Sequence, residues 1–89
     1  MAKFKFNYYC DSGHGWVKVE RQRLHDLGIL NDISNYSYQR NDIVYLEEDS
    51  DLETFLKAMR LEGHEVSFKQ SHTNKKSKIR SYLNFTKGE

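Results

Sequence analysis

The sequence predicts one small α+β domain over residues 1–89, with an antiparallel or mixed sheet of four to six strands and two helices. Two observations predict this class. Short segments in which apolar and polar residues alternate recur along the chain, as in half-buried strands, and one longer segment repeats its apolar residues at helical spacing. The expected order is β-β-α-β-β-α-β, with one more strand as an open alternative. A chain of 89 residues is too short for a two-domain enzyme with a separate cofactor-binding half.

The chain is expected to begin with a β-hairpin and a short helix. Residues 3–9 alternate strictly between apolar and polar side chains, which is the pattern of a strand with one buried face. A turn-forming stretch over residues 11–15 separates them from a second strand over residues 16–19. A helix is predicted over residues 20–27, because Gly28 suits the left-handed position at which helices commonly end.

A second hairpin should follow this helix. Tyrosines alternate with polar residues from Tyr36 onward, and Asn41 and Asp42 tolerate the positive φ of a tight turn. The return strand over residues 43–46 is continuously apolar. That composition predicts a central strand that is covered on both faces.

The second helix has the strongest periodic signal in the chain. Ser50 and Glu53 have the spacing of a capping box, and Gly63 is expected to end the helix. The apolar residues recur at positions i, i+3, i+4 and i+7, and they are Leu52, Phe55, Leu56 and Met59. This stripe should pack on the sheet.

The C-terminal third is harder to assign. Residues 65–69 alternate as a further strand, and residues 71–77 form a polar loop. Residues 79–85 fit either a last strand or a short helix.

The net charge of +1 conceals an uneven distribution. Residues 41–55 hold six acids and no Lys or Arg, whereas residues 64–89 hold six Lys or Arg and two acids. Basic residues beside an aromatic ring are typical of a loop that contacts nucleic-acid phosphates and stacks on a base. The predicted nucleic-acid-binding residues are Lys75, Lys76, Lys78, Arg80 and Tyr82. The alternative is a solvated loop, since nucleic-acid-binding domains usually have a pI above about 9, and this chain has a pI of 7.9.

A contact surface for a protein partner is predicted from glycine, aromatic and charged residues. Two glycines flank His14 at the first hairpin tip and let the backbone approach a partner. Tyrosine is enriched at interfaces, and the acidic edge of Glu47 and Glu48 would match a basic partner. The neighbouring Asp49, Asp51 and Glu53 are explained by the predicted helix N-terminus, where negative charge complements the dipole. The predicted partner-binding residues are His14, Trp16, Tyr36, Tyr38, Arg40, Glu47 and Glu48. For Trp16, and for the tyrosine face formed by Tyr36, Tyr38 and Tyr45 of the second hairpin, burial in the core is the open alternative.

We expect no catalytic residues, metal or cofactor. Cys10 and His14 lie four residues apart in a turn, but no third residue can be identified that would orient them for covalent catalysis. They also lack the second pair of closely spaced ligands that is typical of a structural zinc site. A small ribonuclease or toxin is a further interpretation of the basic loop, with His72 added to its cations. The single cysteine fits a reducing cytoplasm, and no apolar run approaches the ~20 residues of a membrane span.

Four segments, spread in order over nearly the whole chain, carry a resemblance to a known family. They are His14-Gly15-Trp16-Val17-Lys18-Val19, Leu27-Gly28-Ile29, residues 37–49 with the sequence SYQRNDIVYLEED, and Ser77-Lys78-Ile79-Arg80-Ser81-Tyr82. With these segments the chain resembles a family of small proteins encoded by phages, plasmids and other bacterial mobile elements. It departs from that pattern at Asn41, where a glycine is expected in the hairpin turn. The resemblance implies an accessory protein in a bacterial cytoplasm and brings no active-site residues.

The leading hypothesis is a non-enzymatic accessory protein that binds and modulates or inhibits a bacterial host or defence-system macromolecule. Its target would be a bacterial protein or a protein–nucleic-acid complex. This inference is by genome context and not by chemistry. Nucleic-acid binding by the basic C-terminal loop is the first alternative, and the small ribonuclease is the second. A free sheet edge and an exposed aromatic patch would also allow a homodimer.

Overall fold

The computed structural model describes residues 2–75 and 77–86, and it confirms the α+β class and the predicted order of the elements. The elements are β1 (Lys3–Cys10), β2 (Gly15–Glu20), α1 (Arg21–Asp26), the 3-10 turn η1 (Leu30–Asp32), β3 (Tyr38–Arg40), β4 (Ile43–Glu47), α2 (Asp51–Leu61), β5 (Glu65–His72), the 3-10 turn η2 (Lys78–Ser81) and β6 (Leu83–Asn84). Among the helices of these residues, none is long and apolar enough to cross a membrane.

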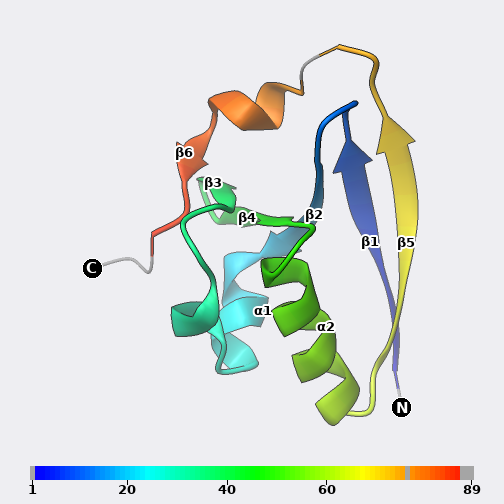
Figure 1. Cartoon of the computed structure of the whole chain (residues 1–89). Helices are drawn as coiled ribbons and strands as arrows, with labels where there is room; N and C mark the ends of the chain where they lie inside the picture. The colour runs from blue at the N-terminus through cyan, green and yellow to red at the C-terminus, as the bar shows by residue number, and fades with distance from the viewer. Residues whose placement is uncertain (1, 76, 87–89) are drawn as a thin grey trace.

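The six strands form one mixed sheet in the order β5-β1-β2-β4-β3-β6. The β1–β5 pair is parallel, and the other four pairs are antiparallel. Strand β2 pairs with β1 only from Gly15 to Val17, and with β4 from Trp16 to Glu20. The sheet therefore divides at β2, and Figure 1 shows β1 and β5 as a ribbon that turns away from the remaining strands.

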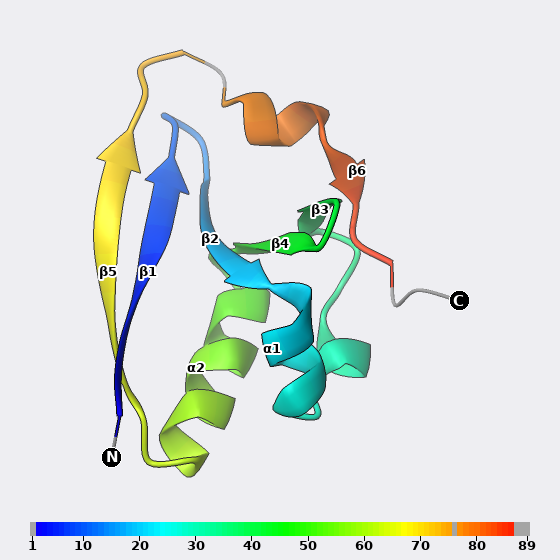
Figure 2. The ribbon, with the colours of Figure 1, turned by 180° about the vertical axis from the view of Figure 1, so that it is seen from behind.

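Both helices pack on the same face of the sheet (Figures 1 and 2). Because side chains alternate along a strand, every second residue of β2 and β4 points to the helices. The core that results is dominated by Val17 and Val19 of β2, Val44 and Leu46 of β4, Leu24 of α1, and Leu52, Phe55 and Met59 of α2. Three of the four residues in the predicted apolar stripe are thus buried, and Leu56 is partly buried and packs against them.

The turns follow the sequence closely. Asn41 has a φ of 56°, as expected for the tight turn between β3 and β4. Gly28 and Gly63, with φ of 74° and 78°, follow the ends of the two α-helices. These are the positions at which a side chain would strain the backbone.

Three expectations about the elements were wrong or incomplete. Strand β4 is central but only half covered, because both helices lie on one face and leave Ile43 and Tyr45 partly exposed. The capping box does not form, since the side chain of Ser50 makes no capping hydrogen bond. Strand β5 continues to His72, which was expected in the loop.

The segment that could not be assigned contains both of its alternatives. Residues 78–81 form η2, and residues 83–84 form β6, which pairs with β3. This part of the chain, drawn in orange in Figure 1, leaves the end of β5 and crosses to the opposite edge of the sheet. Ile79 anchors it and is buried.

Candidate functional site

The face of the sheet that carries no helix collects polar and aromatic side chains from the inner strands. Lys18 of β2 is paired in register with Tyr45 of β4, and Tyr45 with Tyr38 of β3. Residues paired in register point to the same side of a sheet. Val17 and Val44 point to the face that the helices cover. Lys18, Tyr45 and Tyr38 therefore lie on the other face, which we call the helix-free face.

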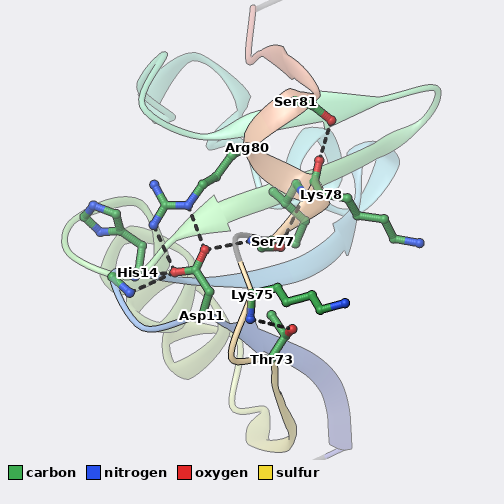
Figure 3. A network of polar contacts seen from close by, with 10 residues as sticks. Asp11, His14, Thr73, Lys75, Ser77, Lys78, Arg80 and Ser81 are labelled. Atoms are coloured by element: carbon green, nitrogen blue, oxygen red, sulfur yellow. Dashed lines mark hydrogen bonds and ion pairs between the residues drawn. The ribbon is translucent and has the colours of Figure 1, made fainter.

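The turn η2 is fastened over this face by Asp11. The carboxylate of Asp11 accepts hydrogen bonds from Nε and Nη2 of Arg80, at 2.7 and 2.9 Å, and from the backbone N–H of Ser77 at 3.0 Å. The same carboxylate accepts the N–H groups of Gly13 and His14. These contacts hold the pKa of Asp11 well below its usual range, and the hydrogen bonds from Arg80 have the largest effect. Figure 3 shows Asp11 at the centre of this network.

Figure 3 also shows that the cations of this segment point in different directions. The side chains of Lys75 and Lys78 extend to one side, whereas the guanidinium of Arg80 turns back to Asp11. The ring of Trp16 lies under that guanidinium, with the Arg80 Cζ 5.3 Å from the ring centroid. The turn η2 therefore separates two hollows, because Lys78 and Tyr82 line one of them and Arg80 lines the other.

The larger hollow, which we call the basic groove, has a volume of about 620 Å³. Its walls come from the ends of β1 and β5, from β2, β3 and β4, and from the segment around η2. The lining residues are Tyr9, Cys10, Lys18, Arg40, Tyr45, Ser71, His72, Thr73, Lys75, Ser77, Lys78, Ile79 and Tyr82. Four of them are Lys or Arg, and within the described residues the lining includes no Asp or Glu.

Aromatic rings and one arginine form an ordered cluster at the groove. The rings of Tyr45 and Tyr82 lie 5.2 Å apart between centroids. The guanidinium of Arg40 lies over the Tyr82 ring at 5.3 Å and donates to its hydroxyl at 3.4 Å. Burial and the neighbouring Tyr82 raise the pKa of Tyr45 above its ordinary value.

A thiol and an imidazole meet at one end of the groove. The Sγ of Cys10 lies 3.4 Å from Nδ1 of His72, because parallel pairing sets these residues side by side at the ends of β1 and β5. The sequence instead suggests His14, four residues away in the turn, as the partner of Cys10. No group of three or more His, Cys, Asp or Glu that could hold a metal ion occurs within residues 2–75 and 77–86.

The smaller hollow, which we call the aromatic hollow, has a volume of about 400 Å³. Its lining residues are His14, Trp16, Tyr36, Tyr38, Glu47, Asp49, Ser50 and Arg80. Trp16 is only 2% exposed, as the core alternative for this residue predicted, whereas Tyr36 is 75% exposed.

The residues predicted to bind a protein partner are divided by the structure. His14, Trp16, Tyr36, Tyr38 and Glu47 line the aromatic hollow together. Arg40 instead lines the basic groove, and Glu48 accepts a 2.6 Å hydrogen bond from the hydroxyl of Tyr8.

The residues predicted to bind nucleic acid are divided as well. Lys75, Lys78 and Tyr82 line the basic groove, and Arg80 lies on the other side of η2. Lys76 lies outside the described residues.

The glycines at the first hairpin tip have an internal role. A Cβ on Gly15 would lie 2.6 Å from Cε1 of Tyr8, and one on Gly13 would lie 2.8 Å from Nη2 of Arg80. Both positions therefore accommodate the chain's own side chains.

Sequence reasoning missed the contribution of the sheet to the groove. Lys18 was placed in a strand without a function, and Tyr45 was considered only as part of the tyrosine face of the second hairpin. Their alternation with buried valines gave the face on which they lie, but the pairing of β2 with β4 was needed to bring them together.

Comparisons with protein-family models, curated proteins and solved structures returned no match to this chain. The assignment of a function therefore depends on the geometry of the site itself.

Proposed function

We propose that the protein binds single-stranded nucleic acid in the basic groove. The observation that carries this proposal is the composition of the lining, in which four Lys or Arg side chains accompany three tyrosines and no carboxylate among the described residues. Nucleic-acid phosphates attract such cations whatever the nucleotide sequence, and exposed aromatic rings stack on bases.

The groove supplies these two functions from different parts of the chain. Lys75 and Lys78 extend together from the segment around η2, and Lys18 joins them from the sheet. Tyr82, with Arg40 over its ring, provides a stacking surface beside them. Because bases must leave a duplex to stack on a protein ring, this arrangement favours a single strand over a duplex.

The moderate pI of the chain is compatible with this proposal. The acids that balance the charge lie largely outside the groove, and Glu47, Asp49 and Asp51 surround the N-terminus of α2. A phosphate that enters the groove therefore meets a local charge of +4, and not the net charge of +1.

The salt dependence of binding tests the proposal. Fluorescence anisotropy of a labelled single-stranded RNA of mixed sequence should give a plot of log K against log salt with a negative slope. Each phosphate contact contributes about 0.7 to its magnitude, so four cations allow at most about 3. The double variant Lys75→Gln/Lys78→Gln should bind more weakly and lose about 1.4 of that slope. Binding that is independent of salt would exclude the proposal.

A matched control distinguishes binding in the basic groove from attraction of RNA to any positive charge on the surface. Lys57 and Arg60 are exposed on α2, on the opposite side of the sheet. The double variant Lys57→Gln/Arg60→Gln removes the same charge and should leave affinity and slope nearly unchanged. If both double variants lose the same affinity, binding is diffuse and the groove is not the site.

Stacking is tested separately at Tyr82. Tyr82→Leu should weaken binding by about 1–3 kcal/mol if a base stacks there. Tyr82→Phe keeps the ring and should retain most of the affinity. If both variants bind equally well, the ring of Tyr82 does not contact a base.

The cellular setting is part of the same proposal. The resemblance to proteins of phages and mobile elements, together with the single cysteine, supports action in a bacterial cytoplasm. The nucleic acid would then be a host or phage strand, bound and not cleaved. Incubation of the protein with bulk RNA tests this last point. If the natural chain produces RNA fragments and Lys75→Gln/Lys78→Gln does not, the function is RNA cleavage and not binding alone.

A further inference from the structure

The aromatic hollow lies on the side of η2 away from the basic groove, and its lining contains carboxylates where that of the groove contains lysines. Four aromatic or imidazole rings line it together with the carboxylates of Glu47 and Asp49. The rings meet at different tilts. Trp16 and Tyr38 are 6.2 Å apart between centroids at 66°, and His14 and Trp16 are 6.2 Å apart at 55°.

The carboxylate of Glu47 is fixed and ionised at the edge of the hollow. Partial burial alone would raise the pKa of Glu47, but the N–H groups of Asp51, Ser50 and Asp49 together lower it. Its Oε1 accepts two of these N–H groups and the Ser50 hydroxyl, whereas its Oε2 accepts only the N–H of Asp49. A carboxylate oxygen has two lone pairs, so Oε2 retains a position for one more donor.

Among the described residues, Arg80 is the one Lys or Arg in the lining, and its charge is already neutralised. Arg80 donates two hydrogen bonds to the carboxylate of Asp11, at 2.7 and 2.9 Å. The charges of Glu47 and Asp49 therefore dominate the hollow. The position of Arg80 over Trp16 also shows that this aromatic surface accommodates a guanidinium, with 5.3 Å between Cζ and the ring centroid.

The rim has an open aromatic surface. Tyr36 is 75% exposed at the mouth of the hollow. The negative face of a tyrosine ring attracts a cation, and the attraction strengthens when the cation loses water in a hollow.

We propose that the aromatic hollow binds the guanidinium of an arginine from an exposed basic segment of a protein partner. The guanidinium lies against the rings of Tyr36 and Tyr38 and donates to Glu47 and Asp49. Arginine is favoured over lysine, because its planar group stacks on an aromatic ring and donates to two carboxylates at once. This site extends the function beyond nucleic-acid binding to a second class of partner, at a separate surface.

Paired peptides test the site directly. A short fluorescein-labelled peptide in which arginines alternate with glycine and serine is titrated with the full chain, and its counterpart carries citrulline in place of arginine. Citrulline has nearly the same shape without the charge, so its peptide should bind about tenfold more weakly. Equal affinity for the two peptides would overturn the proposal.

Variants then locate the binding. Tyr36→Ala and Asp49→Asn should each weaken binding of the arginine peptide several-fold, while Tyr36→Phe keeps the ring and the affinity. Both residues are exposed, so the fold should tolerate these changes. The controls Asp42→Asn and Lys75→Gln/Lys78→Gln, which lie outside the hollow, should leave the affinity unchanged. Loss of affinity in a control but not in Tyr36→Ala would place the peptide elsewhere and refute the assignment.

A second copy of this chain is the remaining occupant to exclude. Sedimentation velocity of the protein alone should give a monomer. A dimer that dissociates in Tyr36→Ala would assign the hollow to self-association and overturn the proposed partner.

Discussion

Asp11 joins two parts of the chain that are 69 residues apart in sequence. In the sequence it is one of several turn-forming residues between two strands, and nothing in its neighbourhood indicates that it would be buried. In the structure it is 7% exposed and binds both Arg80 and the backbone of Ser77. A turn residue can be predicted from local propensity, but a partner at this distance in sequence cannot.

The depressed pKa of Asp11 predicts how stability depends on acid. In the unfolded chain an aspartate has a pKa of about 3.9. Because the folded-state pKa is lower, the carboxylate stabilises the fold fully above about pH 4. This contribution is lost as the pH falls below that value, since the unfolded chain then binds a proton that the folded chain does not. Urea midpoints measured between pH 7 and pH 3 should show this loss.

The variant Asp11→Asn isolates the effect. It should unfold at lower urea than the natural chain at pH 7, and the difference between the two should shrink as the pH is lowered to 3. Asp42→Asn removes an exposed carboxylate at the other hairpin and should leave the pH dependence as it is. A difference between Asp11→Asn and the natural chain that stays constant with pH would contradict the role of the charge.

At the scale of elements, helix α2 was predicted correctly, but the residue that caps its N-terminus was not. The predicted Ser50 and Glu53 pair is replaced by Glu47, which reaches from the end of β4 and accepts N–H groups of Asp49, Ser50 and Asp51. The capping carboxylate also places negative charge at the positive end of the helix dipole. Part of the acidic run thus has a structural role, but that role belongs to Glu47, whereas the helix-dipole alternative was argued for Asp49, Asp51 and Glu53.

This cap gives a prediction for the stability of α2. Glu47→Ala should lower the free energy of unfolding by about 0.5–2 kcal/mol, as the loss of other N-terminal caps does. Glu53→Ala, at the position that the capping box would have used, should have a clearly smaller effect. Chemical denaturation of the two variants measures both values. If Glu53→Ala costs more than Glu47→Ala, the capping box operates in solution.

Local pattern predicted most elements, and pairing between distant segments accounts for what it missed. The alternation in residues 3–9 and the periodicity of α2 are properties of neighbouring residues, and both were confirmed. The length of β5 depends on its parallel partner β1, which holds the strand in register as far as His72. The contact of Cys10 with His72 arises from the same pairing and was therefore invisible in the sequence.

At the scale of the whole molecule, charge is sorted between the two sides of η2. Lys75 and Lys78 face a groove whose described lining holds no carboxylate, and Glu47 and Asp49 face the aromatic hollow. Both the basic and the acidic segment are recognisable from composition alone. Composition cannot separate Arg80 from the neighbouring cations, because the direction of each side chain depends on how η2 lies over Trp16.

The placement of Arg80 makes a prediction that distinguishes a structural cation from a phosphate-binding one. If Arg80 only fastens η2, then Arg80→Gln should weaken RNA binding about threefold, because binding must then order a loosened segment. The slope of log K against log salt should not change, since no phosphate contact is removed. Asp11→Asn should have the same effect, although it alters no cation. By contrast, Lys78→Gln should reduce the magnitude of the slope by about 0.7. A similar reduction in Arg80→Gln, with circular dichroism showing an intact fold, would place Arg80 on the nucleic acid after all.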